Sequence, residues 1–458
     1  MPQAFQIEKR LLVLGAFFIS ASCWSQEYFT PLANQCHRHV IQLDFEQADS
    51  LLPIAFFEEK ENLYLHVIQS KLEFLKIFLS EDNSLVEPFE IQEEIRRNII
   101  SKMENDSLKN IFLSELYLQQ ALLELKFANY FSSARWLFKT KNKCENNPKV
   151  QAIIDGITGT VPSKYQWLLR TVGFKGNLQT GKRLLENYSN NNWKEEAQYV
   201  LGFYNLFLAH DTLPNLEHST NTSTLLYLFQ AHLKNDGNTV IENGSNLVKA
   251  EISEKMPYIK FLLGRAFINA NHSHGVPLLN EYLKENNGPF HNAKAHLLLY
   301  EYAQLNNIEY TLDTILEIET LNDGDNFIKT IVKEELLPSR QLIEAKHLQD
   351  FGLEDSALQL LKSINTSKLN KYEQQEYWYR LGKLDTINTA IHLNKSFEIE
   401  TDILLYYPIA AKYELAKSCL ERKPELAKLL LKEILDSEDF AYKRSFDQKA
   451  EALLSRLH

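Results

Sequence analysis

Cysteine, glycine and proline are all scarce in this chain, which has 4, 15 and 13 of them among 458 residues. The cysteines stand far apart, and Cys23 lies in an apolar N-terminal stretch. Without that stretch an odd number remains, so no disulfide framework holds the fold. Runs that alternate apolar and polar residues are also missing, which excludes a fold built mainly from strands.

The chain lacks the short motifs of common catalytic sites. No His-Glu-x-x-His, Gly-x-Ser-x-Gly or Gly-x-Gly-x-x-Gly motif occurs, and the phosphate-loop spacing is missing. Its acidic clusters contain lysines as well, and no spacing pairs two buried carboxylates. We therefore expect no enzyme activity and no cofactor.

The formal net charge is −11, and residues 1–25 contribute +1, so the remainder carries −12. A chain this acidic repels phosphate backbones over most of its surface. We therefore expect no nucleic-acid partner. No stretch of 18 or more apolar residues occurs, so we also expect no transmembrane span in the mature chain.

The N-terminus has the pattern of a signal peptide covering residues 1–25. Lys9-Arg10 precede an apolar run from Leu11 to Trp24, and the small residues Cys23 and Ser25 precede Gln26. This predicts export to the periplasm or the medium. Acylation of Cys23, which would anchor the protein to the outer membrane, is the alternative.

Apolar residues recur at helical spacing over long stretches, as at Leu113, Leu116, Tyr117 and Leu123, with Gln120 on the same face. This spacing predicts an all-α fold. From typical helix and turn lengths we expect roughly sixteen to twenty helices.

A pattern resembling the tetratricopeptide repeat recurs among these helices. Ala345 and Leu348 precede Ala357 and Leu361, with a turn at Phe351-Gly352 between them. The pattern returns at Ala134 and Phe138, at Leu263-Gly264 and Phe267, at Trp378-x-x-Leu381-Gly382, and at Ala427 and Leu431. The intervals are irregular. We predict a degenerate tetratricopeptide-like α-solenoid of antiparallel helix hairpins over residues 26–458, bent near residues 156–181 into two lobes.

The segment from Gly156 to Leu185 differs from the rest of the chain. It contains a third of the glycines and no Asp or Glu, and its five basic residues are Lys164, Arg170, Lys175, Lys182 and Arg183. One interpretation is a docking patch for an anion or acidic protein, where glycines allow close approach to backbone N–H groups. The other is a pair of helices joined at residues 173–177, with solvated lysines.

The same segment resembles known tetratricopeptide proteins through Val161-Pro162, Leu168-Leu169, Gly173-Phe174-x-Gly176, Gly181 and Leu184-Leu185. Residues 156–185 are similar to a eukaryotic family implicated in inclusion-body clearance, and to large proteins exported by Bacteroidetes-type bacteria. Residues 406–457 resemble the closing repeat of that group. The signal peptide and the Asn- and Lys-rich composition favour the bacterial proteins. The resemblance implies a helical-repeat scaffold with no assigned catalytic residues.

Three segments contain residue types that bind metals, but none has a complete ligand spacing. Cys36-His37-Arg38-His39 places only Cys36 and His39 on one helical face, which favours a partly exposed first helix. His272 and His274 lie in a turn. Residues 322–326 lack the spacing and terminal Glu of a calcium loop, which indicates a helix-capping turn. We expect no metal site.

Two functions fit these observations. The first is an exported scaffold that binds a protein or peptide, an acidic one in particular, in a groove lined by successive inner helices. The second is a glycan- or nutrient-binding protein associated with the outer membrane and built on tetratricopeptide helices. Scarce tryptophan and short loops favour the first.

Overall fold

The computed structural model describes residues 28–159, 173–174, 176–188, 193–209, 211–216, 220–250, 252–440, 442–454 and 457. Regular structure in these residues consists of 23 α-helices with short 3-10 and π turns, and no strand is present among them. The all-α prediction is confirmed. The helices outnumber the roughly sixteen to twenty expected.

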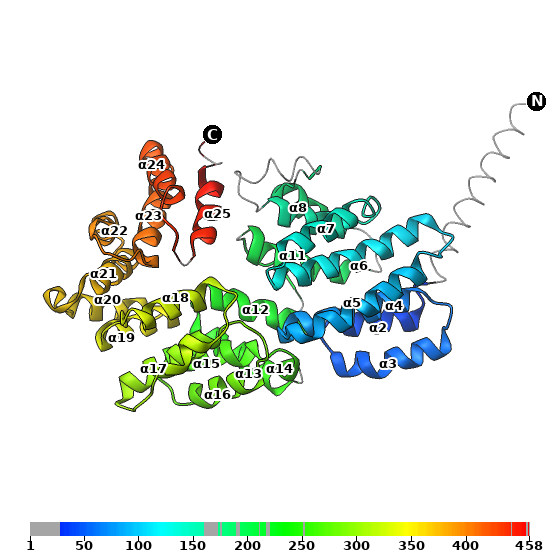
Figure 1. Ribbon diagram of the computed structural model, residues 1–458, viewed down its shortest axis with the longest axis horizontal. Helices are drawn as coiled ribbons and strands as arrows, with labels where there is room; N and C mark the ends of the chain where they lie inside the picture. Colours follow the sequence, from blue (N-terminus) through cyan, green and yellow to red (C-terminus); the bar gives the residue numbers. More distant parts are fainter. Residues whose placement is uncertain are drawn as a thin grey trace, which may run out of the picture.

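The helices follow one another along the whole chain (Figure 1). The first ten, drawn from blue to green, are α2 (Pro31–Ile41), α3 (Phe45–Glu58), α4 (Tyr64–Ser80), α5 (Val86–Ile100), α6 (Asp106–Lys126), α7 (Tyr130–Lys141), α8 (Pro148–Gly159), α10 (Leu178–Glu186), α11 (Lys194–Tyr204) and α12 (Asn221–Leu233). The next seven are α13 (Gly237–Lys249), α14 (Ile252–Lys255), α15 (Tyr258–Asn269), α16 (Gly275–Glu285), α17 (Asn292–Asn306), α18 (Asp323–Lys333) and α19 (Arg340–Phe351). The last six are α20 (Glu354–Ser363), α21 (Lys371–Leu384), α22 (Thr389–Glu398), α23 (Tyr406–Cys419), α24 (Pro424–Leu435) and α25 (Lys443–Leu454).

Local signals in the sequence explain where many helices begin and end. Thr220 and Asn370 form capping boxes with the residues three positions later, which satisfies free backbone N–H groups at the starts of α12 and α21. Asn322 caps α18 through the backbone N–H of Asp325, so residues 322–326 form the predicted helix-capping turn. Gly352 ends α19 with φ +95°, a conformation that glycine adopts without strain.

Helices that are neighbours in sequence pack side by side, as in the pairs α6–α7, α15–α16, α19–α20, α21–α22 and α23–α24. Ala345, Ala357 and Ala427 are fully buried, as the repeat pattern predicts. Small residues at these positions allow two helices to cross closely. The prediction was wrong at Ala134 and Phe138, which are exposed because α7 turns a different face toward α6.

The packing is not limited to neighbours in sequence. Thr222 at the start of α12 donates a hydrogen bond to the carbonyl oxygen of Ile41 at 2.6 Å, across 181 residues. The turn after α16 approaches the end of α4, where a Cβ on Gly288 would lie 2.3 Å from the carbonyl oxygen of Glu81. One hydrophobic cluster accordingly contains buried residues from Ala33 to Leu299.

Figure 1 shows the C-terminal helix α25 returning toward the side of the molecule that holds α8 and α11. The chain therefore curves back on itself rather than extending in one direction. In the described residues, none of the helices combines the length and the apolar character that crossing a membrane requires.

Candidate functional site

The structure describes only part of the basic segment that the sequence singles out. Lys164, Arg170 and Lys175 lie outside the described residues. Lys182 and Arg183 are described, and both lie on α10, which begins at Leu178 as predicted.

The two described basic residues have different surroundings. The ammonium group of Lys182 lies 2.5 Å from a carboxylate oxygen of Asp211 and 3.9 Å from one of Glu186. The hydrogen bond to Asp211 raises the pKa of Lys182. Arg183 is exposed, and within the described residues its guanidinium group makes no ion pair. Lys182 is therefore already neutralised, whereas Arg183 is free to contact a ligand.

Arg183 lines a pocket of about 460 Å³ between α8, α10 and Trp193. The other lining residues are mainly polar or aromatic: Asn146, Pro148, Thr180, Leu184, Asn187, Tyr188 and Trp193. The N-terminus of α8 also faces this pocket, since Pro148 is its first residue. A cationic side chain and the positive end of a helix both favour a negatively charged group here.

Described glycines of this segment serve the packing of helices. A Cβ on Gly181 would lie 2.5 Å from the hydroxyl oxygen of Tyr204 and 2.7 Å from the carbonyl oxygen of Ala152. A Cβ on Gly156 would lie 2.5 Å from the same tyrosine ring. The glycines thus bring α8, α10 and α11 into close contact.

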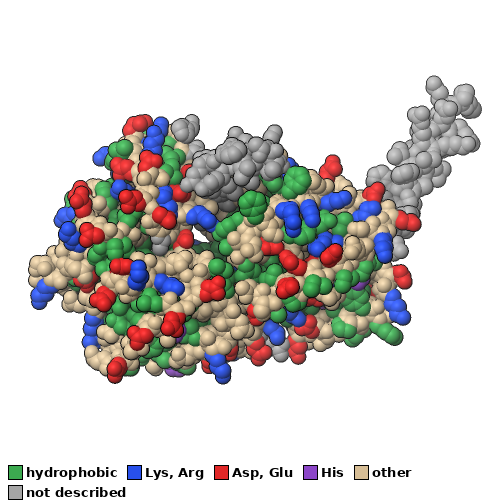
Figure 2. Space-filling model, in the orientation of Figure 1, with side chains coloured by type: hydrophobic (Ala, Val, Ile, Leu, Met, Phe, Trp, Pro, Cys, Tyr) green, Lys and Arg blue, Asp and Glu red, His purple; other side chains and the backbone are tan. Residues whose placement is uncertain are grey.

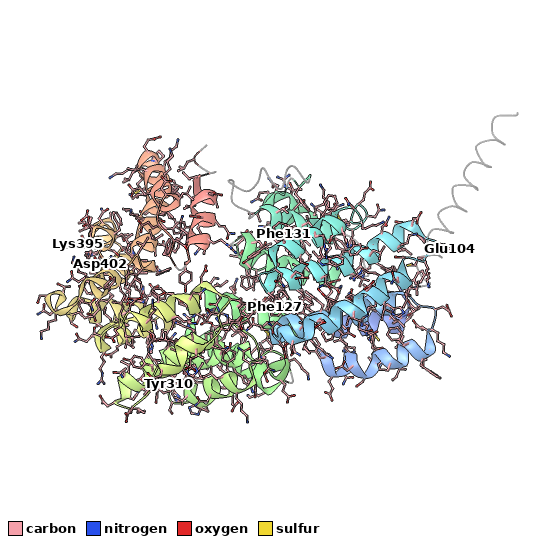
Figure 3. The ribbon with its side chains drawn as sticks, viewed as in Figure 1. Glu104, Phe127, Phe131, Tyr310, Lys395 and Asp402 are labelled. Carbon is pink, nitrogen blue, oxygen red and sulfur yellow. The ribbon has the colours of Figure 1, made fainter. Side chains whose placement is uncertain are left out.

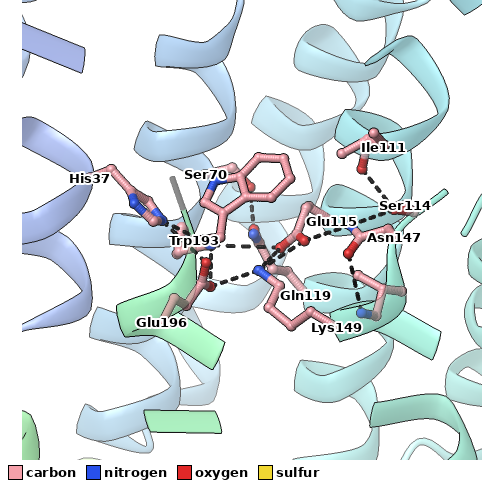
Figure 4. A network of polar contacts seen from close by, with 12 residues as sticks. His37, Ser70, Ile111, Ser114, Glu115, Gln119, Asn147, Lys149, Trp193 and Glu196 are labelled. Carbon is pink, nitrogen blue, oxygen red and sulfur yellow. Dashed lines mark hydrogen bonds and ion pairs between the residues drawn. The ribbon is translucent and has the colours of Figure 1, made fainter. Parts of the chain in front are cut away.

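A network of buried charges lies next to this pocket (Figure 4). It joins His37 of α2, Lys71 of α4, Glu115 of α6, Lys149 of α8 and Glu196 of α11, each less than 9% exposed. Its two lysines balance its two glutamates. Each residue comes from a different helix, so the network ties together five helices of the first half of the chain.

The two glutamates are bridged by lysines at short distances. Lys149 lies 2.9 Å from a carboxylate oxygen of Glu115 and 2.8 Å from one of Glu196. Lys71 donates a hydrogen bond to Glu196 and lies 3.6 Å from Glu115. His37 Nε2 lies 3.2 Å from the other carboxylate oxygen of Glu196.

Burial and pairing act in opposite directions on the pKa values of these groups. Burial alone would raise the pKa of Glu196, but Lys149 and Lys71 outweigh it and hold the pKa well below its ordinary value. Burial lowers the pKa of His37, although its hydrogen bond to Glu196 opposes this. Burial also lowers the pKa of Lys71, although Glu196 opposes this. The network therefore places two lysines and two glutamates, which stabilise one another's charged forms, around a histidine whose charged form burial disfavours.

Trp193 connects the network to the pocket. Its indole nitrogen donates a hydrogen bond to the hydroxyl of Tyr64 at 2.7 Å, and Lys149 Nζ lies 5.8 Å from the centre of its ring. Trp193, which forms one wall of the pocket, thus packs against Lys149, whose position is fixed by its ion pairs with Glu115 and Glu196. We interpret the network as a rigid base for the pocket, since its lysines and glutamates are buried and form several ion pairs with one another.

A second group of basic residues gathers on α5 and α7. Lys139 Nζ lies 4.0 Å from the centre of the Trp136 ring, and the guanidinium carbons of Arg97 and Arg135 lie at 4.8 and 5.5 Å. Tyr117 stacks against the same indole at 5.7 Å. Figure 2 shows Lys and Arg side chains gathered over this part of the surface. The sequence analysis missed this group. Arg135, Trp136 and Lys139 are close in sequence, but only the fold brings Arg97 to them.

A second pocket, of about 720 Å³, lies at the junction of α5, α6 and α7. Its aromatic lining residues are Tyr130 and Phe131. Phe131, labelled in Figure 3, is 97% exposed. Glu87, Glu90 and Glu124 form the acidic side of the pocket. Burial raises the pKa of Glu90, and the neighbouring Glu124 raises it further. The fold thus places a half-buried carboxyl group, that of Glu90, beside the buried one of Glu124.

The segments with metal-binding residue types have other roles. The first helix, α2, is partly exposed as expected: Arg38 is exposed, whereas Cys36 and His37 face the core. His272 and His274 lie in the predicted turn with their Nδ1 atoms 2.8 Å apart. Across the described part of the chain, His, Cys, Asp and Glu side chains form no group of three or more that could hold a metal ion.

Comparison of the chain with protein-family models, with curated proteins and with solved structures gives no significant match.

Proposed function

We propose that this protein is an exported helical-repeat scaffold that binds another protein or peptide and has no catalytic activity. In this proposal residues 1–25 are removed as a signal peptide, and the helices form a degenerate tetratricopeptide-like solenoid. The paired packing of consecutive helices and the buried alanines at their crossings support it. Release into the periplasm or medium is the proposed fate, with anchoring through Cys23 as the alternative.

The observation that carries the proposal is the exposed guanidinium group of Arg183, which makes no ion pair with the described residues, in the pocket beside Trp193. Arginine binds a carboxylate through two parallel hydrogen bonds, and an aromatic wall adds contact area for the rest of a peptide. The network under Trp193 holds that wall in place, which lowers the entropy lost on binding. We propose that an acidic segment of the partner binds here, with Lys164, Arg170, Lys175 and Lys182 completing the docking patch.

A glycan or nutrient ligand is the second candidate, and the lining of the same pocket favours it. Trp193 and Tyr188 offer aromatic surface, while Asn146, Asn187 and Thr180 offer hydrogen-bonding groups. A sugar needs this combination of a ring face and several short polar side chains. Trp193 is only 4% exposed, however, which leaves little ring surface for stacking and favours the peptide.

Isothermal titration calorimetry with the mature protein tests both candidates. The titrants are an acidic peptide of six glutamates, its glutamine counterpart, and a panel of neutral oligosaccharides. The variant changes Lys164, Arg170, Lys175, Lys182 and Arg183 to Gln. We expect the acidic peptide alone to bind and the variant to lose that binding, with a melting temperature close to that of the wild type.

Two outcomes would overturn the peptide proposal. Binding of an oligosaccharide but not of the acidic peptide would establish the glycan alternative. Equal binding of the acidic peptide by the wild type and the variant would show that the basic segment is not the docking patch. A large fall in melting temperature would instead assign these side chains a structural role.

A further inference from the structure

The three basic side chains around Trp136 carry no ion pair within the described residues. Arg97, Arg135 and Lys139 all lie within 5.5 Å of the centre of one indole ring. The formal net charge of the chain is −11, so acidic residues outnumber basic ones. Three adjacent cations without a bound carboxylate are therefore unusual in this protein. Their mutual repulsion disfavours this arrangement unless an anion neutralises it.

Acidic residues close to this group interact with it only at longer range, and within the described residues none forms an ion pair with it. Glu93 lies 2.8 Å from Arg96, and Glu90 accepts a hydrogen bond from Gln120 at 2.7 Å. Glu94 is exposed and makes no ion pair within the described residues. The fold thus leaves the three cations with hydrogen-bonding capacity that an external acceptor can use.

Two donors in the group have no acceptor at all. Nη1 of Arg97 and Nε1 of Trp136 are both buried and make no hydrogen bond within the described residues. Leaving a buried donor unpaired is unfavourable, so such positions are normally occupied by an acceptor. Burial lowers the pKa of Arg97, and Glu93, Glu94 and Glu90 offset this only in part. Burial and then Arg135 and Arg97 lower the pKa of Lys139.

We infer that Arg97, Arg135 and Lys139, arranged around Trp136, form a second binding site, which takes a short carboxylate-bearing segment of a partner protein. Guanidinium groups that contact an aromatic ring through their faces keep their N–H edges free for a carboxylate. The site does not depend on the proposed role of Arg183, because it uses a different set of side chains.

The surroundings of the site favour a short acidic segment over a long polyanion. Glu87, Glu90 and Glu124 line the adjoining pocket, so negative charge borders the cations on one side. Both Arg97 and Arg135 interact electrostatically with Glu90, which places that pocket next to the basic group. A polyanion that ran past the three cations would meet these carboxylates and be repelled.

The test measures the binding of a fluorescein-labelled hexaglutamate peptide by fluorescence anisotropy, with a hexaglutamine peptide as the neutral control. The variant carries Arg97→Gln, Arg135→Gln and Lys139→Gln. A matched control removes three exposed lysines elsewhere, Lys333→Gln, Lys362→Gln and Lys423→Gln, and so has the same net charge. Both variants are also made in the background of the five-glutamine variant, in which the Arg183 patch no longer binds the probe. There we expect the Kd to rise at least tenfold when Arg97, Arg135 and Lys139 are changed and less than twofold in the control, with higher salt weakening binding.

Three results would overturn the inference: no binding of hexaglutamate to the wild type, equal loss in both variants, or tighter binding of a heparin fragment than of the peptide. The five-glutamine variant of the basic segment separates this site from the Arg183 pocket. Binding lost only in that variant would support the proposed function and exclude the Trp136 site. Binding lost only in the Arg97, Arg135 and Lys139 variant would support the Trp136 site and count against the Arg183 pocket. Partial loss of binding in both variants would establish two sites.

Circular dichroism and thermal melting of each variant check that the fold is intact. If the triple variant unfolds, Lys139→Gln alone provides the test, because this side chain is exposed. A Kd unchanged in that single variant would then count against the inference.

Discussion

Arg444 of the C-terminal helix α25 contacts Tyr130 at the start of α7, 314 residues earlier in the chain. Its guanidinium group donates a hydrogen bond to the tyrosine hydroxyl and lies 4.6 Å from the centre of the ring. Tyr130 also lines the acidic pocket beside Phe131. The contact therefore joins the last helix of the chain to the edge of a pocket formed by early helices.

A double-mutant cycle with Arg444→Ala and Tyr130→Ala measures this contact. We expect a coupling free energy of about 0.5–1 kcal/mol, typical of an exposed cation–aromatic pair. Urea denaturation of the wild type, the two single variants and the double variant gives the value. Hydrogen exchange in α25 should become faster in both single variants. A coupling near zero would mean that other contacts hold α25 in place.

The buried network predicts that substitutions at two adjacent glutamates, Glu195 and Glu196, change the unfolding free energy by very different amounts. Glu196→Gln leaves Lys71 and Lys149 with one carboxylate between them, and removing one partner of a buried ion pair costs about 3–5 kcal/mol of unfolding free energy. Glu195 is the matched control. Its side chain is 34% exposed and lies 3.3 Å from Arg38, which is itself 66% exposed.

We expect Glu195→Gln to change the unfolding free energy by about 1 kcal/mol or less, as is usual for exposed ion pairs. Urea denaturation at pH 7 compares the two variants. Similar losses in both would show that the network contributes no more than a surface pair.

Stability should fall as the solution is made acidic, beginning with two histidines. Burial lowers the pKa of His232 to about 3 and that of His291 to about 4, from an ordinary value of 6.5. The unfolded chain therefore binds protons at a pH where the folded chain does not. The contribution of the two histidines to the unfolding free energy is fully present above pH 6.5. It is lost as the pH falls toward their pKa values in the folded protein.

Each histidine should account for about 1 kcal/mol of this loss by pH 5.5. Urea denaturation at pH 7.0, 6.2 and 5.5 measures it, and His232→Gln should make the decline shallower. The carboxylates act at lower pH. Burial alone would raise the pKa of Asp350, but Arg265 and Arg380 hold it at about 2, so its contribution disappears only below about pH 4. A stability independent of pH between 7.0 and 5.5 would contradict the assignment of buried neutral histidines.

The repeat pattern in the sequence was sufficient to predict much of the local structure. Ala345, Ala357 and Ala427 occupy buried positions, and Gly352 ends α19 where the pattern requires a turn. These features depend on residues close together in the chain, whose spacing matches the helical period. The prediction for Ala134 and Phe138 was wrong. The spacing of residues predicts which of them share a face of a helix, but it does not predict which face packs against the neighbouring helix.

The candidate sites were largely invisible in the sequence. Arg183 belongs to a conspicuous basic segment, but its pocket also needs Trp193 and the start of α8. Arg97 lies on a different helix from Trp136, and nothing in their spacing relates them. Short-range patterns can identify a charged segment, whereas a binding surface requires side chains from several helices.

The sequence by itself determined the all-α class, the ends of many helices and the small residues at helix crossings, because these depend on local hydrogen bonding and on helical periodicity. Only the tertiary structure decided which charged residues are buried. Lys71, Glu115, Lys149 and Glu196 have the residue types of a solvated surface, yet five packed helices place them in one network. Their burial depends on partners that lie up to 125 residues away, and no local pattern specifies such partners.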